Sequence, residues 1–136
     1  MTTAENYIKA VTQWARDNDM VAALGLIGSH ARNEARLDSD IDFIIISDDK
    51  TALVGEHSWV GKFGKTRKIE VERWGIVTSL RIFYDGGQEI EFGVAPPSWA
   101  YLPVDAGTRR IVSEGMKILV DKQVLLSRLH KAVMGK

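Results

Sequence analysis

Residues 28–42 read Gly28-Ser29-His30-Ala31-Arg32-Asn33-Glu34-Ala35-Arg36-Leu37-Asp38-Ser39-Asp40-Ile41-Asp42. An apolar run lies on each side of this stretch, Val21–Ile27 before it and Ile41–Ile46 overlapping its end. Short runs of this kind, one stopped by glycine and the other rich in isoleucine, are typical of buried strands. The stretch therefore connects two strands of a predicted sheet, with one or two helical turns among its polar residues.

The beginning of this connection has the features of a phosphate-binding turn. A strand that ends in Gly28-Ser29 and turns into a helix exposes backbone N–H groups that have no partner within the helix. Glycine lets the backbone approach a ligand closely, and a helix N-terminus favours an anion such as a triphosphate. The Ser29 hydroxyl adds a donor, and Arg32 follows about one helical turn later. We expect Gly28, Ser29 and Arg32 to bind a nucleotide.

The end of the connection carries a pair of acids. Asp40 and Asp42 are two residues apart at the start of a strand, so both side chains point to one face while Ile41 points into the core. Two carboxylates so close repel each other strongly unless a cation lies between them. Mg²⁺ prefers oxygen ligands of this kind and joins one or two carboxylates to substrate phosphates. The pair is therefore predicted to bind metal.

A third acid comes from a later strand, Glu89-Ile90-Glu91-Phe92-Gly93-Val94. Ile90 and Phe92 face the core, so Glu89 and Glu91 face the other side. Glu91 is flanked by two large apolar residues, whereas Glu89 is closer to a glycine-rich turn and to solvent. We choose Glu91 to complete a two-metal site.

Each of these features also has a simpler explanation. Ser and Asp are common helix N-caps, so Ser39 or Asp40 could simply cap a helix. Arg32, Glu34 and Arg36 could form an ordinary charged helix face. The acids are harder to explain in this way, because they open a run of four apolar residues where strand propensity favours Val or Thr. Local rules broken in this manner tend to mark function.

The rest of the chain predicts an α/β (α+β) fold with a mixed sheet of about five strands flanked by helices. We expect one domain over residues 1–136. An amphipathic helix runs to about Asp17, and another spans Lys122–Met134. Thr78–Tyr84 and Glu89–Val94 form a hairpin around Asp85-Gly86-Gly87. The glycine-rich, basic segment Gly55–Lys68 is interpreted as a mobile loop.

Composition excludes several classes of protein. The chain has no cysteine, which removes disulfides, thiolate metal sites and cysteine nucleophiles. Lys and Arg number 18, as do Asp and Glu, so no basic excess indicates binding to long nucleic acid. No apolar run is long enough to span a membrane, and the N-terminus has no signal-peptide pattern. We expect a cytoplasmic protein with a small-molecule ligand.

The motif residues resemble the nucleotidyltransferase superfamily that includes DNA polymerase beta and the aminoglycoside nucleotidyltransferases. The family motif is Gly-Ser, ten residues, then Asp-x-Asp, and Gly28-Ser29 with Asp40-Ile41-Asp42 fits it without a gap. Ala31-Arg32 and residues 39–43 are similar to small stand-alone members called minimal nucleotidyltransferases. The family's third acid lies between apolar residues on a later strand, and Glu91 matches that pattern. The resemblance covers about residues 24–94.

The resemblance implies a Mg²⁺-dependent enzyme that transfers a nucleoside monophosphate from an NTP, ATP in particular, to a hydroxyl of a small molecule or partner protein. It implies two Mg²⁺ ions held by Asp40, Asp42 and Glu91 as catalytic and metal-binding residues, with Glu91 accepting the proton of the nucleophile. Two departures stand out. His30 replaces the Arg of many relatives, and Glu91 replaces the commoner Asp.

Partners are predicted from what the sequence lacks and from its aromatic residues. No helical acceptor-binding domain is visible, so a second subunit is expected to complete the pocket. The residues Trp59, Trp74, Trp99 and Tyr101, with the Pro96–Pro103 segment, predict an aromatic interface and a homodimer. The alternative function is that of an antitoxin-like minimal nucleotidyltransferase, which binds or adenylylates a helical toxin.

Overall fold

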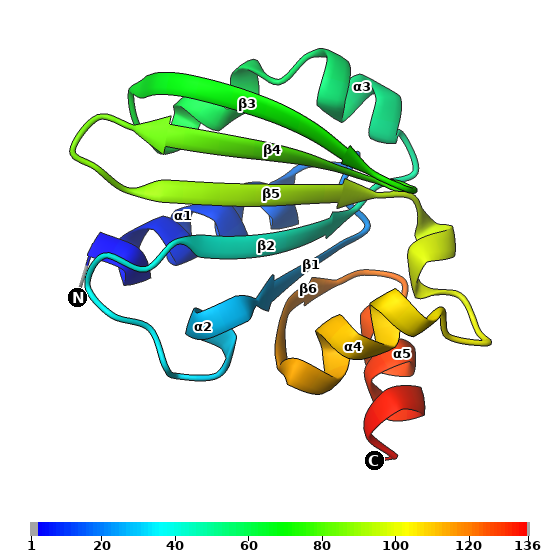
Figure 1. Ribbon diagram of the computed structural model, residues 1–136. Helices are drawn as coiled ribbons and strands as arrows, with labels where there is room; N and C mark the ends of the chain where they lie inside the picture. The colour runs from blue at the N-terminus through cyan, green and yellow to red at the C-terminus, as the bar shows by residue number, and fades with distance from the viewer. Residues whose placement is uncertain (1–2, 136) are drawn as a thin grey trace.

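The computed structural model describes residues 3–135, which form a six-stranded sheet with helices on both faces (Figure 1). The strands lie in the order β3-β4-β5-β2-β1-β6. Their bounds are β1 Ala23–Ile27, β2 Ile41–Ile46, β3 Thr66–Trp74, β4 Val77–Tyr84, β5 Glu89–Ala95 and β6 Met116–Asp121. The α-helices are α1 Thr3–Asp17, α2 Gly28–Ala31, α3 Lys50–Gly55, α4 Ala106–Glu114 and α5 Leu125–Met134, with 3₁₀-helices η1 Ser58–Phe63 and η2 Pro97–Ala100. The predicted mixed α/β class is confirmed.

The centre of the sheet is the parallel pair of β2 and β5. In its register Asp42 lies opposite Glu91, and Phe43 lies opposite Phe92. On the other side of β2, the antiparallel strand β1 sets Ile27 opposite Asp42. Since successive side chains of a strand point to opposite faces, this register puts acids on one face of the sheet and aromatic rings on the other.

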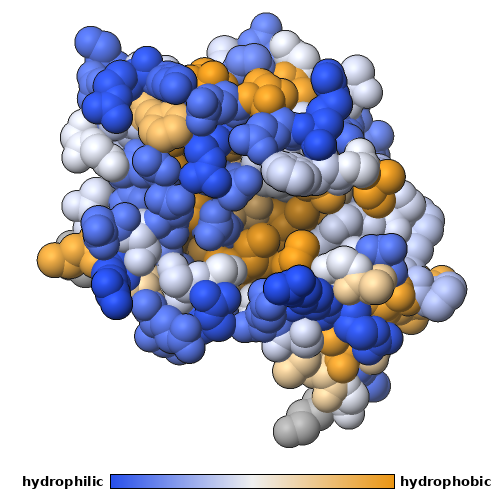
Figure 2. All heavy atoms as spheres, in the orientation of Figure 1, coloured by the Kyte–Doolittle hydropathy of each residue, from blue (hydrophilic) through white to orange (hydrophobic). Residues whose placement is uncertain are grey.

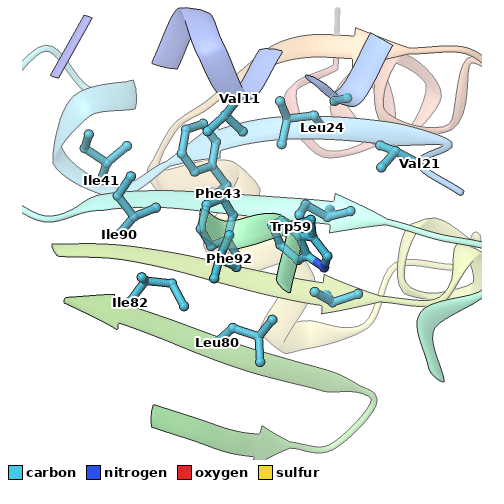
Figure 3. Packing of buried hydrophobic residues seen from close by; sticks show 14 of the residues in the cluster. Val11, Val21, Leu24, Ile41, Phe43, Trp59, Leu80, Ile82, Ile90 and Phe92 are labelled. Atoms are coloured by element: carbon cyan, nitrogen blue, oxygen red, sulfur yellow. The ribbon is translucent and has the colours of Figure 1, made fainter. Parts of the chain in front are cut away.

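The face with the aromatic rings is covered over its central strands. Helix α1 and the segment from α3 to η1 pack on it, and its buried side chains meet in one apolar cluster (Figure 3). Phe43 and Phe92 stack with ring centroids 5.5 Å apart, and Trp59 packs edge-on against Phe92 at 5.0 Å. This core holds the central strands in place from behind.

The opposite face is covered only in part. Helices α4 and α5, together with η2, pack over its β1, β2 and β6 side and enclose a second apolar cluster that includes Ile44, Trp99 and Leu129. In Figure 1 α4 and α5 lie at the lower right beside β6, and no helix is drawn in front of β3–β5. Side chains on the front of β4 and β5 therefore line an open surface beside α4.

Several predicted elements are confirmed, and some are corrected. The β4–β5 hairpin has the predicted turn, and α1 ends at Asp17 as expected. Strand β6 was not predicted, because Met116–Asp121 carries no clear alternation of buried and exposed residues. Helix α5 begins three residues later than expected, at Leu125, because Lys122 follows directly after β6 and its backbone N–H still bonds to the carbonyl of Ala22.

The prediction of a mobile loop over Gly55–Lys68 is wrong. Residues 58–63 form η1, and β3 already starts at Thr66. Trp59 is only 6% exposed, stacks on Trp14 at 4.5 Å, and donates a hydrogen bond to the carbonyl of Leu53 at 3.0 Å. Burial of one large ring therefore orders a segment whose composition is otherwise polar. Among residues 3–135, no helix combines the length and apolarity needed to cross a membrane.

Candidate functional site

Asp42 lies at the centre of the candidate site, between the turn after β1 and the neighbouring strand β5. Gly28 begins that turn with φ +73°, and a Cβ built on it would lie 2.5 Å from Oδ2 of Asp42. A positive φ and such a close approach both require glycine. The backbone at the start of α2 is thus held directly against the Asp42 carboxylate.

The acids on β5 and before β2 are joined through one arginine. Arg81 on β4 donates from Nη1 to Oδ2 of Asp40 at 3.0 Å and to Oε2 of Glu89 at 3.3 Å. Its Nη2 donates to Oε2 of Glu91 at 3.3 Å. The other oxygen of Glu91 accepts a 2.6 Å hydrogen bond from the hydroxyl of Ser79. The last two of these hydrogen bonds fix the orientation of Glu91 next to Asp42.

This arrangement raises the pKa of Asp42. Burial raises the pKa of its carboxyl from an ordinary 3.8 to about 7, with further increases from the charge of Glu91, a hydrogen bond to Glu91 and the charge of Asp40. The positive charge of Arg81 lowers the pKa of Asp42, but less than these effects raise it. Near neutral pH Asp42 therefore holds a proton for part of the time, and a cation would release it.

The pH dependence of stability follows from this shift. From pH 3.8 to about 7 the folded protein keeps a proton on Asp42 that the unfolded chain has lost. The free energy of unfolding should therefore fall as the pH rises through this window and level off above it. In Asp42→Asn this fall should be smaller, and the metal-free variant should melt higher than the parent at about pH 8. Thermal melts at about pH 5 and pH 8 test this, with Asp38→Asn, an exposed acid, as the control. Parallel pH profiles for the parent and Asp42→Asn would contradict it.

A cavity of about 760 Å³ opens from the acids across the uncovered part of the sheet. Gly28, Arg32, Asp42 and Glu91 line it, together with residues of β4, β5, η2 and α4. In Figure 2 hydrophobic surface gathers in the middle of this face, with hydrophilic surface around it. The cavity is therefore polar where Asp42 and Glu91 lie, mainly apolar along β3, β4 and η2, and polar again at Asp105 and Glu114.

The apolar part of the cavity includes two exposed aromatic rings. Trp74 at the end of β3 is 64% exposed, and Tyr101 after η2 is 57% exposed. Ile76 lies in the same wall and is also exposed. Trp99, by contrast, is 5% exposed and packs in the second core, so the predicted aromatic surface of Pro96–Pro103 is only partly present.

The family of the chain is decided by comparison with known proteins. The family model described as streptomycin adenylyltransferase matches residues 1–134. The chain belongs to this family. Its membership confirms the resemblance to nucleotidyltransferases. No curated protein matches the chain.

Among the similar solved structures, one with a TM-score above 0.5 supports the fold. An aminoglycoside 6-adenyltransferase from Bacillus subtilis aligns with 69% of this chain and 35% of its own, at TM-score 0.57 and 15% identity. The polymerase core of TRAMP, an RNA surveillance complex, aligns with 67% of this chain and 29% of its own (TM-score 0.45, 22% identity). A cytoplasmic RNA terminal U-transferase aligns with 82% and 38% (TM-score 0.47, 16% identity). The chain thus spans between 29% and 38% of the length of these structures.

The six predicted site residues of this adenylyltransferase-family chain occupy different positions around the cavity. Gly28, Arg32, Asp42 and Glu91 line it, whereas Ser29 and Asp40 do not. Asp40 bonds to Arg81, and the Nε of Arg32 bonds to Glu34 at 3.2 Å, as in an ordinary surface ion pair. Within residues 3–135, no three acid or histidine side chains converge closely enough to share one metal ion. Asp42 and Glu91 are paired residues of β2 and β5, and the charge of Glu91 helps to raise the pKa of Asp42.

Sequence reasoning missed the residues that come from β4. Arg81 and Ser79 look like ordinary polar positions of an alternating strand, and nothing near them in the chain marks them. Their register was a usable signal, since the predicted β4–β5 hairpin sets Arg81 directly opposite Glu91. A basic residue paired with a candidate metal ligand was therefore within reach of the sequence alone.

Proposed function

We propose that this chain transfers a nucleoside monophosphate from ATP to a hydroxyl group of a small molecule. The observation that supports it most is the contact of the Gly28 backbone with Asp42, because it joins a phosphate-binding turn to a carboxylate that favours a cation. Both border the same cavity, in a chain of the streptomycin adenylyltransferase family.

The carboxylates fit the divalent ion that such an enzyme uses. Asp42 and Glu91 offer oxygen ligands side by side. Burial and the neighbouring acids raise the pKa of Asp42, so a cation bound beside it would stabilise its charged form. We propose that Asp40, Asp42 and Glu91 hold two Mg²⁺ ions between them. When bound, Mg²⁺ neutralises the triphosphate and makes the acceptor hydroxyl easier to deprotonate.

The remaining roles belong to the chain's own residues. Gly28 and Ser29 donate backbone N–H groups to the triphosphate, and Arg32 turns from Glu34 to the phosphates. Glu91 takes the proton of the acceptor hydroxyl as that oxygen bonds to the α-phosphorus and the bond to pyrophosphate breaks. Ser79 holds Glu91 in position for this transfer through its 2.6 Å hydrogen bond.

The cavity supports a small acceptor. Its volume of about 760 Å³ lies in the range of sites for small ligands, and Trp74 and Tyr101 offer flat apolar surface next to the acids. Streptomycin is the first acceptor to test, given the family to which the chain belongs. The predicted homodimer and helical toxin partner stay predictions, and exposed Trp74 and Tyr101 are the surface on which a partner would show protection.

Thermal shift measurements test the proposed ligands. ATP and Mg²⁺ together are expected to raise the melting temperature more than the sum of their separate effects, because triphosphate alone adds negative charge to an acidic cleft. Release of pyrophosphate with streptomycin as acceptor then tests the transfer itself. Equal shifts with ATP and with ATP plus Mg²⁺ would contradict the metal-binding role of the carboxylates.

A further inference from the structure

Arg81 has an unusual position for a residue next to a proposed metal site. Its guanidinium contacts Asp40, Glu89 and Glu91 at once, at 3.0 to 3.3 Å. Two of these three acids are proposed metal ligands. The side chains are all partly buried, between 30% and 39% exposed, so water screens the charges only in part.

The register of β4 and β5 places Arg81 beside these acids. Arg81 is the direct cross-strand neighbour of Glu91 on β4 and β5, and both side chains lie on the open face of the sheet. Burial alone would lower the pKa of Arg81, but the charges of Glu91 and Asp40 and its hydrogen bonds to Asp40 and Glu89 raise it overall. The guanidinium is therefore a permanent positive charge within the acid cluster.

We propose that Arg81 is a built-in counter-ion that holds Asp40 and Glu91 in the metal-free protein and gives them up when a divalent cation binds. The inference rests on the proposed function for the presence of the metal. Its geometric basis is that Oδ2 of Asp40 and Oε2 of Glu91 both accept hydrogen bonds from the guanidinium, so these two oxygens already have a positively charged partner. A divalent cation and a guanidinium bound to the same two oxygens would also repel each other.

Glu89 can remain the hydrogen-bond partner of Arg81 after Asp40 and Glu91 bind the cation. It bonds to Nη1 of Arg81 at 3.3 Å and is not one of the proposed ligands. A guanidinium that keeps Glu89 while it loses Asp40 and Glu91 retains a charged hydrogen bond and needs only a change of side-chain rotamer. Glu89 therefore favours the released position, and Arg81 alternates between two sets of carboxylates.

A permanent structural role for Arg81 predicts the opposite response to mutation. If Arg81 only holds the carboxylates in a geometry that suits the metal, its removal weakens metal binding. If Arg81 competes with the metal, its removal strengthens binding. The sign of the change in affinity therefore separates the two roles.

Binding of Mn²⁺, measured by the loss of its free electron paramagnetic resonance signal, tests the inference without any substrate. We expect Arg81→Gln to bind Mn²⁺ at least about threefold to tenfold tighter than the parent, the scale of one partly screened charge pair. Glu89→Gln should bind it more weakly, because Arg81 then has only Asp40 and Glu91 as partners. Arg73→Gln, an exposed change on β3, should leave the affinity unchanged. A pH of about 8.5 lies above the pKa of about 7 that Asp42 has in the parent, and loss of the Arg81 charge raises this pKa, which by itself would weaken rather than strengthen Mn²⁺ binding.

Arg81→Lys covers the case in which Arg81→Gln does not fold. It keeps one positive charge but lacks the planar fork that bridges several carboxylates, so its affinity for Mn²⁺ should lie above that of the parent. Weaker or unchanged binding in the folded Arg81 variants would overturn the inference and leave the proposed function standing. Absence of Mn²⁺ binding in the parent and in every variant would overturn both.

Discussion

Asp42→Asn is expected to reduce nucleotidyl transfer by at least about 10²–10³-fold, the scale at which loss of one transition-state contact acts in other enzymes. Asn keeps the shape of the side chain but cannot carry the charge that holds a cation next to the α-phosphate. The fold should be unharmed, because burial and Glu91 already favour the neutral form of Asp42. Initial rates of pyrophosphate release at saturating ATP and Mg²⁺ measure the effect.

The matched control for this loss is Asp38→Asn. Asp38 is exposed in the same connection between β1 and β2 and lines no part of the cavity. The Asp38→Asn substitution changes the net charge by the same amount as Asp42→Asn. A rate close to that of the parent in Asp38→Asn would therefore show that the loss in Asp42→Asn comes from the position of Asp42 and not from the change in net charge. Retention of more than about a tenth of the parent rate in Asp42→Asn would remove Asp42 from the proposed machinery.

Trp59→Ala is expected to lower the free energy of unfolding by about 3–5 kcal/mol, the usual cost of removing a large buried ring. The side chain stacks on Trp14, packs edge-on against Phe92 and donates its indole N–H to the carbonyl of Leu53. Alanine leaves a cavity behind β5 and a buried carbonyl without its donor. Urea unfolding followed by circular dichroism measures the change.

Trp74→Ala provides the comparison within the same protein. Trp74 is 64% exposed at the end of β3, so its removal should change the stability by only about 0.5 kcal/mol. A difference of several kcal/mol between the two variants would show that η1 is part of the core. Equal losses would mean that the packing of η1 on β5 contributes little.

The contrast between these tryptophans also shows what local sequence can predict. Residues 58–63 are surrounded by glycine, lysine and histidine, and this composition indicates a loop. What orders the segment is a contact with Trp14, about 45 residues earlier in the chain, which periodicity does not reveal. Strand β6 is hidden for the same reason, since only its pairing with β1 makes it a strand.

The elements near the site were easier to predict because their signals are local. The spacing of Asp40 and Asp42 fixes which face they share, and the isoleucines around them fix the strand. Glu91 could be chosen over Glu89 from its apolar neighbours, and the structure sets it opposite Asp42. The residues next to Arg81 in the chain give no such signal, because its proposed role depends on its pairing with Glu91 on β5.

Local sequence also could not predict how the carboxylates divide among their partners. A hydrogen bond draws Asp40 to Arg81, whereas the charge of Glu91 raises the pKa of Asp42. These choices depend on distances of a few tenths of an ångström across three strands, which spacing along one strand does not determine. The functional roles of the six predicted residues stay proposals for the same reason, and the variants above address them.

The parallel pairing of β2 with β5 has a consequence for misfolding. A slip of one residue in either strand would turn its alternate side chains to the other face. Asp42 or Glu91 would then enter the cluster around Phe43, Phe92 and Trp59, where a charge has no partner and costs several kcal/mol. The acids proposed for catalysis thus also penalise wrongly aligned sheets during folding. Replacing both by neutral residues would remove that penalty together with the proposed activity.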